Sequence, residues 1–548
     1  MSDLLRMTGM YSGMDTESIV SQLVKTKSTK VTNLKNEQKK LEWKQTAWQD
    51  LNSKIYNMYS KTLSNLRLTS AYSKKSTVSS DSTKATVVAS EGAVNGTQTL
   101  KVNKLAKSGY LTGAKLDGKT STTTGTDGKD VTKVVNWETT DKLSEIDSNL
   151  TGKTISITTG SGTDAKTTDI EITADMTIND LVAKFKDAGV NASFDTTNQR
   201  FFINSTGTGS AKNFTLTSDD STALASLGLD PDATYTDING SKNSCVKIEG
   251  QDAEIVLNGA TFTSDSNTFS INGLTINTLG VTDEEISIVT STDYDGIYNT
   301  IKDFLTEYND LINEMDKLYN ADSARKYDML TDDEKESMTD DEVEQWEDKI
   351  KSALLRKDNS LYNVMNTLTS TMMEGFYENN LSDKEKKNMS SSEITAWYKE
   401  NGGKKHYLSD YGIGTLSYFE AQDNEHHAYH INGDADDEFT STKEDKLKAA
   451  IAEDPEGTAN FFATLCKTLY SKLDETMSES TEYSSIYKVY NDKQLKKDYK
   501  DYTTKISDAE DELNDYEDRW YNKFSKMEVA LSKLQSQTSS ISSMLGSN

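Results

Sequence analysis

The chain has 548 residues, more than a single hydrophobic core usually serves, so we expect several domains. Its formal charge of −28, from 60 basic and 88 acidic side chains, argues against nucleic acid or an anionic membrane surface as the main partner. No stretch approaches the roughly 20 apolar residues of a membrane helix, and Met1 to Val24 lacks a basic segment followed by an apolar one. We therefore expect no membrane insertion and no cleaved signal peptide.

The N-terminal region has the apolar spacing of a coiled-coil or bundle helix. Leu34, Leu41, Trp48 and Ile55 follow one another at intervals of seven residues, with Leu51 and Met58 at the interleaved positions. Such a helix cannot bury its apolar stripe alone. We expect it to pack on the C-terminal helix or on neighbouring copies.

From about Thr77 to Val289 the chain is rich in Thr, Ser, Gly and Asn, with short alternating apolar runs that predict strands. Examples are Ile155 with Ile157, and Ile170 with Ile172. The dipeptides Asn258-Gly259 and Asn272-Gly273 predict tight hairpin turns, because both residues accept positive φ angles.

One helix interrupts these strands. Ile178, Leu181, Val182 and Phe185 fall on a single face. Thr177 and Asp180 have the spacing of a capping box, and Gly189 marks the end of the helix. A hairpin should follow, with strands at Val190–Phe194 and Arg200–Ile203 and a polar turn at Asp195–Gln199.

Helical spacing returns at Tyr294 and continues to Met315 along one broad apolar face. An acidic stretch, Asp322–Asp348, leads into a further helical pattern around Leu354–Met373. We expect one more helix over Lys443–Met477, around Pro455.

The C-terminal region predicts one long helix. Its apolar positions step by three and four, with one extra step of four that interrupts the heptad repeat. They are Tyr499, Tyr502, Ile506, Ala509, Leu513, Tyr516, Trp520, Phe524, Met527, Leu531, Leu534, Thr538, Ile541 and Leu545.

These patterns predict an α+β multidomain fold in which long coiled-coil helices at both termini and a helical bundle flank β-rich middle domains. The N- and C-terminal segments should pack together. The expected divisions are an N-terminal helical segment (1–76), the β-rich domains (77–290), a bundle helix (291–321), an acidic helical and hairpin insertion (322–440), a second bundle helix (441–480) and the C-terminal coiled-coil helix (481–548).

The sequence predicts no catalytic, cofactor or metal site. His426, His427 and His430 lie near several acids, but no ligand spacing is established, and an exposed polar hairpin is the favoured interpretation. The acids after Gly433 lack the spacing of a calcium loop and predict an acidic turn. Cys245 and Cys466 are too far apart for a disulfide framework, and Cys466 lies on an apolar helix face, which indicates a structural thiol.

Several segments, taken in order, resemble the flagellar filament cap proteins, also called the hook-associated protein 2 family. The segments are Tyr11–Asp15, Ser18–Leu23, Ala71–Ser73, Val94–Thr97, Leu100–Ala106, Ile178–Ile203, Ala253–Leu279, Tyr308–Ile312, Leu408–Ile413, Asp454–Gly457 and Gln535–Gln537. Each motif is weak alone, whereas their order covers nearly the whole chain. Asp322–Glu438 departs from the family pattern, being longer and more acidic.

The resemblance implies a non-enzymatic scaffold, a closed ring of copies at the distal tip of the extracellular flagellum, beneath which flagellin folds and polymerises. Implied partners are flagellin, other hook-associated proteins, an export chaperone and the type III export apparatus, through which the chain leaves without a cleaved signal. The alternatives are an adhesive surface protein, whose β-rich domains bind mucin or host glycans, and an unrelated secreted hydrolase.

The candidate residues for oligomer or filament contact are the stripe positions of the two terminal helices. They are Leu34, Leu41, Trp48, Ile55, Ile506, Leu513, Tyr516, Trp520, Met527, Leu531, Leu534 and Ile541. The aromatic positions among them equally fit an intramolecular seam, and the sequence leaves both interpretations open.

Overall fold

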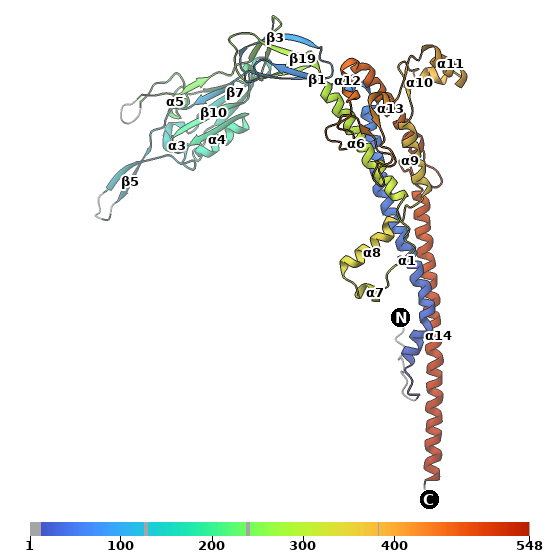
Figure 1. The fold of residues 1–548 in the computed structure, drawn as a ribbon. Helices are drawn as coiled ribbons and strands as arrows, with labels where there is room; N and C mark the ends of the chain where they lie inside the picture. Colours follow the sequence, from blue (N-terminus) through green and yellow to red (C-terminus); the bar gives the residue numbers. More distant parts are fainter. Residues whose placement is uncertain (1–11, 125, 127–129, 237–241, 382, 547–548) are drawn as a thin grey trace. The chain divides into compact units, whose positions relative to one another are not determined.

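The computed structural model describes residues 12–124, 126, 130–236, 242–381 and 383–546, which divide into two units. One unit is mainly helical and is built from the residues before Lys74 together with those after Asp293. The other, Lys74–Asp293, is one uninterrupted stretch made mainly of strands. Figure 1 shows the elements of both units. The predicted α+β architecture is confirmed.

The core of the helical unit is formed by α1 (Thr16–Asn57), α6 (Tyr294–Tyr319), α9 (Asn359–Met372), α12 (Lys446–Glu453) and α13 (Pro455–Met477). A π-helical turn, η1 (Met58–Leu63), extends α1 and places Met58 and Leu63 in the same core. The apolar face predicted for α6 is confirmed. Its buried members include Ile297, Ile301, Phe304, Leu305, Tyr308, Leu311, Ile312 and Met315.

The single helix expected over Lys443–Met477 is wrong. The chain forms two helices, α12 and α13, which are separated at Asp454 by a non-helical backbone with φ −142° and ψ 83°. Proline disfavours helical geometry in the residue before it and is well accepted as the first helical residue. Pro455 therefore begins α13 instead of lying within one helix, and the Gly457 amide donates to Asp454 Oδ1 at 2.9 Å.

The segment that departs from the family pattern contributes directly to this core. Leu361, Val364 and Leu368 of α9 are buried in it, as are Leu408 and Ile413 further along. Helix α9 begins only at Asn359, because Lys357 has a φ of +56° and Asp358 caps the helix. The other elements between α6 and α12 are α7 (Asp332–Glu336), α8 (Asp340–Ser352), α10 (Asp383–Lys387), α11 (Ser391–Asn401), η6 (Leu408–Tyr411) and the short strands β20 (Phe376–Tyr377), β21 (Lys405–His406), β22 (Ile413–Gly414) and β23 (His430–Ile431).

The β unit contains two lobes, each with its own core. The first lobe has a five-stranded sheet in the order β1-β19-β3-β15-β16 and a three-stranded sheet in the order β17-β18-β2. Its strands are β1 (Lys75–Ser79), β2 (Ala85–Ala89), β3 (Gly96–Lys104), β15 (Ala253–Leu257), β16 (Ala260–Ser264), β17 (Thr268–Ile271), β18 (Leu274–Thr278) and β19 (Ile286–Thr292). The two predicted hairpin turns are confirmed: Asn258 and Gly259 have φ values of +49° and +82°, and Asn272 and Gly273 have +47° and +79°.

The second lobe lies between Lys107 and Gly250 in the sequence. It has a four-stranded sheet in the order β14-β4-β10-β9 and a three-stranded sheet in the order β11-β7-β8. Their bounds are β4 (Ser108–Thr112), β7 (Thr154–Thr159), β8 (Lys166–Glu171), β9 (Val190–Asp195), β10 (Arg200–Thr208), β11 (Phe214–Ser218) and β14 (Val246–Ile248). Two-stranded pairs are formed by β5 (Lys119–Thr124) with β6 (Asp130–Val135), and by β12 (Tyr235–Thr236) with β13 (Lys242–Asn243).

The helix and hairpin expected in this lobe are confirmed. Helix α4 (Ile178–Asp187) buries all four predicted apolar residues, and its Thr177–Asp180 capping box is closed by both backbone amides. It ends before Gly189, whose φ is +98°. Strands β9 and β10 then pair antiparallel, so that their alternate residues Ala192, Phe194, Phe201 and Ile203 face the core.

Candidate functional site

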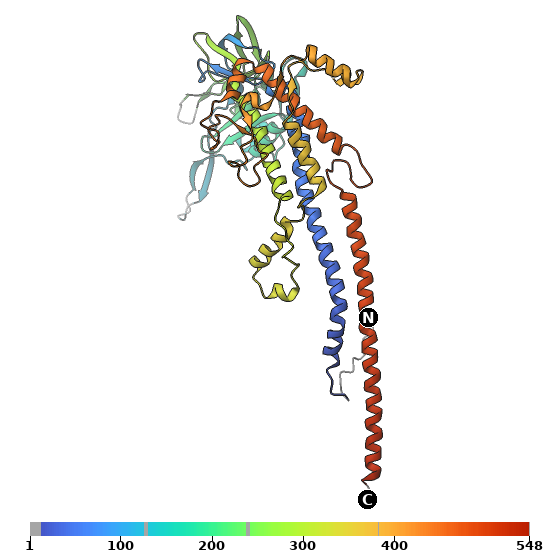
Figure 2. The same ribbon diagram turned by 45° about the vertical axis from the view of Figure 1, so that its right-hand side comes forward.

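The two terminal helices, α1 and α14 (Asp492–Leu545), lie antiparallel along each other, and we call this pair the stem. Both views show them side by side (Figures 1 and 2). Residue numbers fall along α14 as they rise along α1 in the contacts Lys30–Glu512, Gln38–Thr503 and Gln45–Leu495. The predicted pairing of the termini is confirmed, and α14 runs unbroken through the expected irregularity in its heptad repeat.

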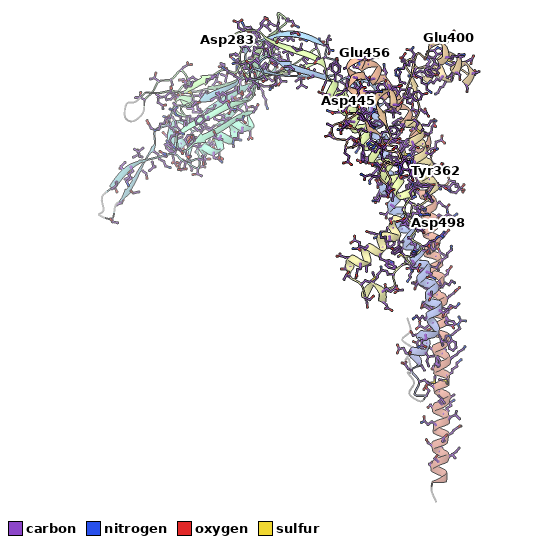
Figure 3. The ribbon with its side chains drawn as sticks, in the orientation of Figure 1. Asp283, Tyr362, Glu400, Asp445, Glu456 and Asp498 are labelled. Carbon is purple, nitrogen blue, oxygen red and sulfur yellow. The ribbon has the colours of Figure 1, made fainter. Side chains whose placement is uncertain are left out.

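Exposed polar pairs set the register of the stem. Lys30 Nζ lies 3.1 Å from Glu512 Oε2, and Lys35 Nζ lies 2.6 Å from Glu510 Oε1. Exposed ion pairs contribute little free energy, typically about 0–1 kcal/mol. Figure 3, in which Asp498 marks the first turns of α14, shows side chains standing off the helices over the length of the stem. The stem is therefore held mainly by its partly buried apolar residues.

The predicted contact residues fall into three groups by exposure. Trp48, Ile55 and Ile506 are buried, the first two in the core of the helical unit. The half-buried group is Leu34, Leu41, Leu513, Tyr516, Trp520, Met527 and Leu531. Leu534 and Ile541 are exposed. The first group thus lies inside the chain's own packing, whereas Leu534 and Ile541, on the last turns of α14, are not covered by the described residues.

Asn52 holds the stem to the loop that precedes α14, a role that the apolar spacing did not reveal. Its side chain is buried, donates to the Tyr487 carbonyl at 3.1 Å and accepts from the Val489 amide at 3.0 Å. Buried amides of this kind are costly unless both of their groups are paired. The available signal was a polar residue next to Leu51 within the apolar stripe.

The π-helical turn η1 carries a second buried polar group. The Tyr59 hydroxyl lies 2.6 Å from Asp474 Oδ1 and 3.0 Å from the Tyr470 hydroxyl. Burial, together with the hydrogen bond to Asp474, raises the pKa of Tyr59 above its ordinary value. The Tyr59 ring stacks on Tyr470 with centroids 4.5 Å apart, and the Arg67 guanidinium lies 4.1 Å from the centre of the Tyr470 ring. These contacts hold η1 against α13.

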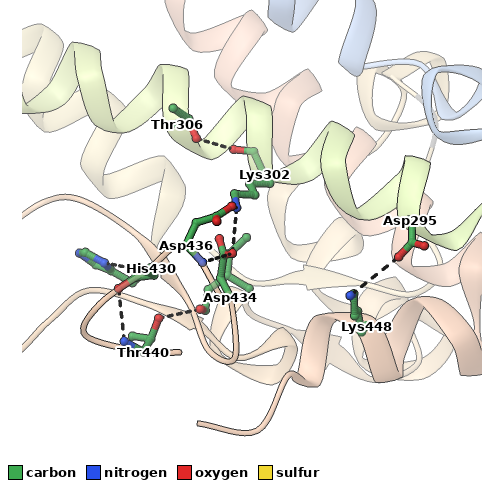
Figure 4. Close-up of polar contacts among 10 residues, drawn as sticks. Asp295, Lys302, Thr306, His430, Asp434, Asp436, Thr440 and Lys448 are labelled. Atoms are coloured by element: carbon green, nitrogen blue, oxygen red, sulfur yellow. Dashed lines mark hydrogen bonds and ion pairs between the residues drawn. The ribbon is translucent and has the colours of Figure 1, made fainter. Parts of the chain in front are cut away.

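The predicted acidic turn is bound to α6 by one lysine (Figure 4). Lys302 Nζ lies 2.8 Å from Asp434 Oδ1 and 2.6 Å from Asp436 Oδ2. Burial disfavours the charged form of Lys302, but its hydrogen bonds to the two carboxylates outweigh burial and raise its pKa. A cavity of about 460 Å³ lies beside this group. Among the described residues no three His, Cys, Asp or Glu side chains converge as metal ligands.

Replacing Lys302 by methionine is expected to lower the free energy of unfolding of the helical unit by about 1–3 kcal/mol, because the largely buried Asp434 loses a charged partner. Urea denaturation measures the difference. Lys448→Met is the matched control, since Lys448 lies 3.8 Å from Asp295 and both side chains are mostly exposed. Equal losses for the two variants would contradict a clamping role for Lys302.

The thiols offer no nucleophile. Burial raises the pKa of Cys466 to about 12 and that of Cys245 to about 11, so both remain protonated near neutral pH. Cys466 Sγ lies 3.7 Å from the Tyr72 hydroxyl within the helical core. The predicted structural role of Cys466 agrees with this placement.

Two family models match the chain. Flagellar hook-associated protein 2 N-terminus matches residues 12–109, and Flagellar hook-associated protein 2 C-terminus matches residues 250–536, more than half of the chain. Residues 110–249, which include most of the second lobe, lie between the two matched ranges. None of the described helices combines the length and the apolar character that crossing a membrane requires.

Individual proteins are similar over different shares of their length. Flagellar hook-associated protein 2 of Halalkalibacterium halodurans is 23% identical over 586 aligned residues, which cover 98% of this chain and 99% of that protein. The A-type flagellar hook-associated protein 2 of Pseudomonas aeruginosa is 28% identical, covering 57% of this chain and 63% of its own length. A crystal structure of the D1, D2 and D3 domains of the flagellar cap protein from Escherichia coli is 20% identical, with a TM-score of 0.46, and covers 78% of this chain and 95% of that one.

Proposed function

Because this chain belongs to the flagellar hook-associated protein 2 family, we propose that it caps the distal end of a bacterial flagellar filament. In this role it is a homo-oligomeric scaffold beneath which flagellin folds and polymerises, and it keeps flagellin from escaping. It performs no covalent chemistry. The family matches at both ends of the chain carry this proposal, since they include α1 and α14 as far as residue 536.

The stem supplies the physical means of attachment. In both views α14 continues past the N-terminal end of α1 (Figures 1 and 2). The side chains of Leu534 and Ile541, which lie seven residues apart on one side of this last part, are exposed. Such a stripe favours contact with another helix, whether from a neighbouring copy, flagellin or another hook-associated protein. An export chaperone that covers the stripe before secretion through the type III apparatus would prevent premature association.

The matched families and the relatives described above are flagellar, so they do not favour the adhesive alternative. Its expected ligands, mucin and host glycans, remain a prediction for the β unit. Titration of the full chain against mucin would test it.

Deleting the chain from Met527 onward is expected to stop filament growth and to release unpolymerised flagellin into the medium, because the last turns of α14, with the exposed Leu534 and Ile541, are lost. Electron microscopy of cells and flagellin in the culture supernatant give the readouts. A full-length variant with Ser536→Ala and Ser539→Ala is the control, since it keeps Leu534 and Ile541. Normal filaments from the deletion strain would contradict the proposed capping function.

A further inference from the structure

The second lobe of the β unit has an exposed sheet face that is mostly uncharged. Outward residues of β14, β4, β10 and β9 form two uncharged rows across the sheet, Val246-Thr112-Phe202-Ser193 and Ile248-Tyr110-Asn204-Asn191, and a charged pair, Arg200 with Asp195, follows on the same face. We call the eight residues of the two uncharged rows the sheet patch. Its four large apolar side chains, Tyr110, Phe202, Val246 and Ile248, are 39% to 53% exposed. None of the eight residues is charged, in a chain in which 27% of residues are.

The opposite face of the same sheet is already covered. Leu111, Phe201 and Ile203 point into the core of the second lobe, where α4 packs on the sheet. The sheet patch is therefore a second apolar surface that the fold of the lobe does not use. Clustered apolar side chains of this kind mark interaction surfaces on otherwise polar proteins.

The same lobe also carries a projecting pair of strands, β5 and β6, which we call the ribbon. The base of the ribbon is fixed: Trp137 is buried, its Nε1 donates to the Asp117 carbonyl at 2.6 Å, and Gln199 Oε1 accepts from its backbone amide at 2.7 Å. Beyond the base, β5 and β6 pair only with each other among the described strands. A strand of six residues reaches about 20 Å, and an isolated two-stranded sheet is only marginally stable in water.

One face of the ribbon is uncharged over most of its length. It carries Thr120 opposite Val134 and Thr122 opposite Thr132, and its third pair, Thr124 opposite Asp130, brings one acid to the far end. The hydroxyl groups of Thr122 and Thr132 lie 3.2 Å apart and share one hydrogen bond across the ribbon. Lysines, by contrast, lie on the other face, at positions 119 and 133.

We propose that the uncharged face of the ribbon packs on the sheet patch of a neighbouring copy. The partner is inferred from charge: copies that each carry −28 repel, so contact between them is favoured where the facing residues are uncharged. The eight residues of the sheet patch and the pairs Thr120–Val134 and Thr122–Thr132 of the ribbon meet this condition. Apolar side chains on two sheet faces can also interdigitate when the sheets pack face to face, which buries apolar area. Figure 1 shows the ribbon extending away from β10, so it does not cover the patch of its own lobe.

The contact joins two different surfaces, so each copy donates one ribbon and offers one patch. Contacts of this head-to-tail kind close into rings when the rotation between copies allows it. The inference rests on the proposed ring of copies. It adds which surfaces meet, in the part of the chain that lies outside the two family matches.

Cysteine cross-linking between copies tests the contact. Purified full-length Thr122→Cys and Phe202→Cys proteins are mixed under a mild oxidant, and the disulfide-linked dimer is measured on a non-reducing gel. The native Cys245 and Cys466 are buried and give little background. The control mixes Thr122→Cys with Thr215→Cys, which places the thiol on the exposed side of β11 in the same lobe. We expect several-fold more dimer from the first mixture than from the control.

Equal amounts of dimer in the two mixtures would overturn the proposal, as would Phe202→Cys cross-linking to itself as well as it does to the ribbon. Electron microscopy of the unmodified chain separates this failure from that of the proposed function. Rings without ribbon-to-patch cross-links reject only the contact. Absence of any assembly, with or without cysteines, rejects the cap assignment and this contact together.

Discussion

Replacing Trp48 by alanine is expected to lower the free energy of unfolding of the helical unit by about 3–5 kcal/mol, the usual cost of emptying a large aromatic site in a core. Trp48 is 1% exposed, and its ring stacks on Tyr490 with centroids 5.0 Å apart and planes 5° from parallel. The substitution leaves a cavity at the point where α1 meets the start of α14. Guanidinium denaturation monitored by circular dichroism at a helical wavelength measures the loss.

Trp43 gives a matched control on the same helix, because its ring is only partly buried and is approached by Lys39 and Lys351. Trp43→Ala should cost far less than Trp48→Ala. If both substitutions lower the free energy of unfolding equally, the packing around Trp48 would not be a main source of stability in the helical unit. If Trp48→Ala also abolishes filament growth, then growth depends on how α1 holds α14 in place as well as on the last turns of α14 that the deletion removes.

Replacing Phe185 by alanine is expected to destabilise the second lobe by about 3–5 kcal/mol while leaving the unfolding of the helical unit nearly unchanged. Phe185 is fully buried and packs in the core beneath the four-stranded sheet. The β unit and the helical unit share no core cluster among the described residues, so their stabilities should respond separately. Differential scanning calorimetry should show one transition moving and another remaining in place.

Lys186→Ala serves as the control for Phe185→Ala, since Lys186 is exposed on the same short helix. Lys186→Ala should change the free energy of unfolding of either unit by no more than about 0.5 kcal/mol. A parallel shift of both transitions in Phe185→Ala would mean that the two units unfold as one cooperative body.

Local rules in the sequence predicted the elements whose geometry is decided by near neighbours. The capping box at Thr177 and Asp180 fixes the start of α4 within four residues, and Asn258-Gly259 specifies its turn through backbone angles alone. The face of α6 followed from spacing, because a helix with one apolar side has one way to bury it.

The remaining features depend on residues far apart in the chain. Asn52 matters only because Tyr487 and Val489 are brought to it. The ribbon has no buried face, so its strands show little of the alternation that reveals a half-buried strand. The break at Asp454 was readable from Pro455, but the apolar spacing on both sides favoured a single helix. Among the candidate contact residues, the apolar spacing identified the stripe. It could not show that Trp48 is buried in the core whereas Ile541 is exposed.

The division of the chain into one continuous unit and one split unit sets an order of folding. Lys74–Asp293 contains every residue of the β unit, so this unit can form its cores as soon as the whole of that stretch is available to fold. The helical unit joins partners such as Asn52 and Tyr487, which are 435 positions apart, and closing so long a loop is slow. A chain that emerges from its N-terminus first would therefore carry a finished β unit and an unclosed stem. The stem would form completely only after the residues of α14 have emerged, because α1 needs them as its partner.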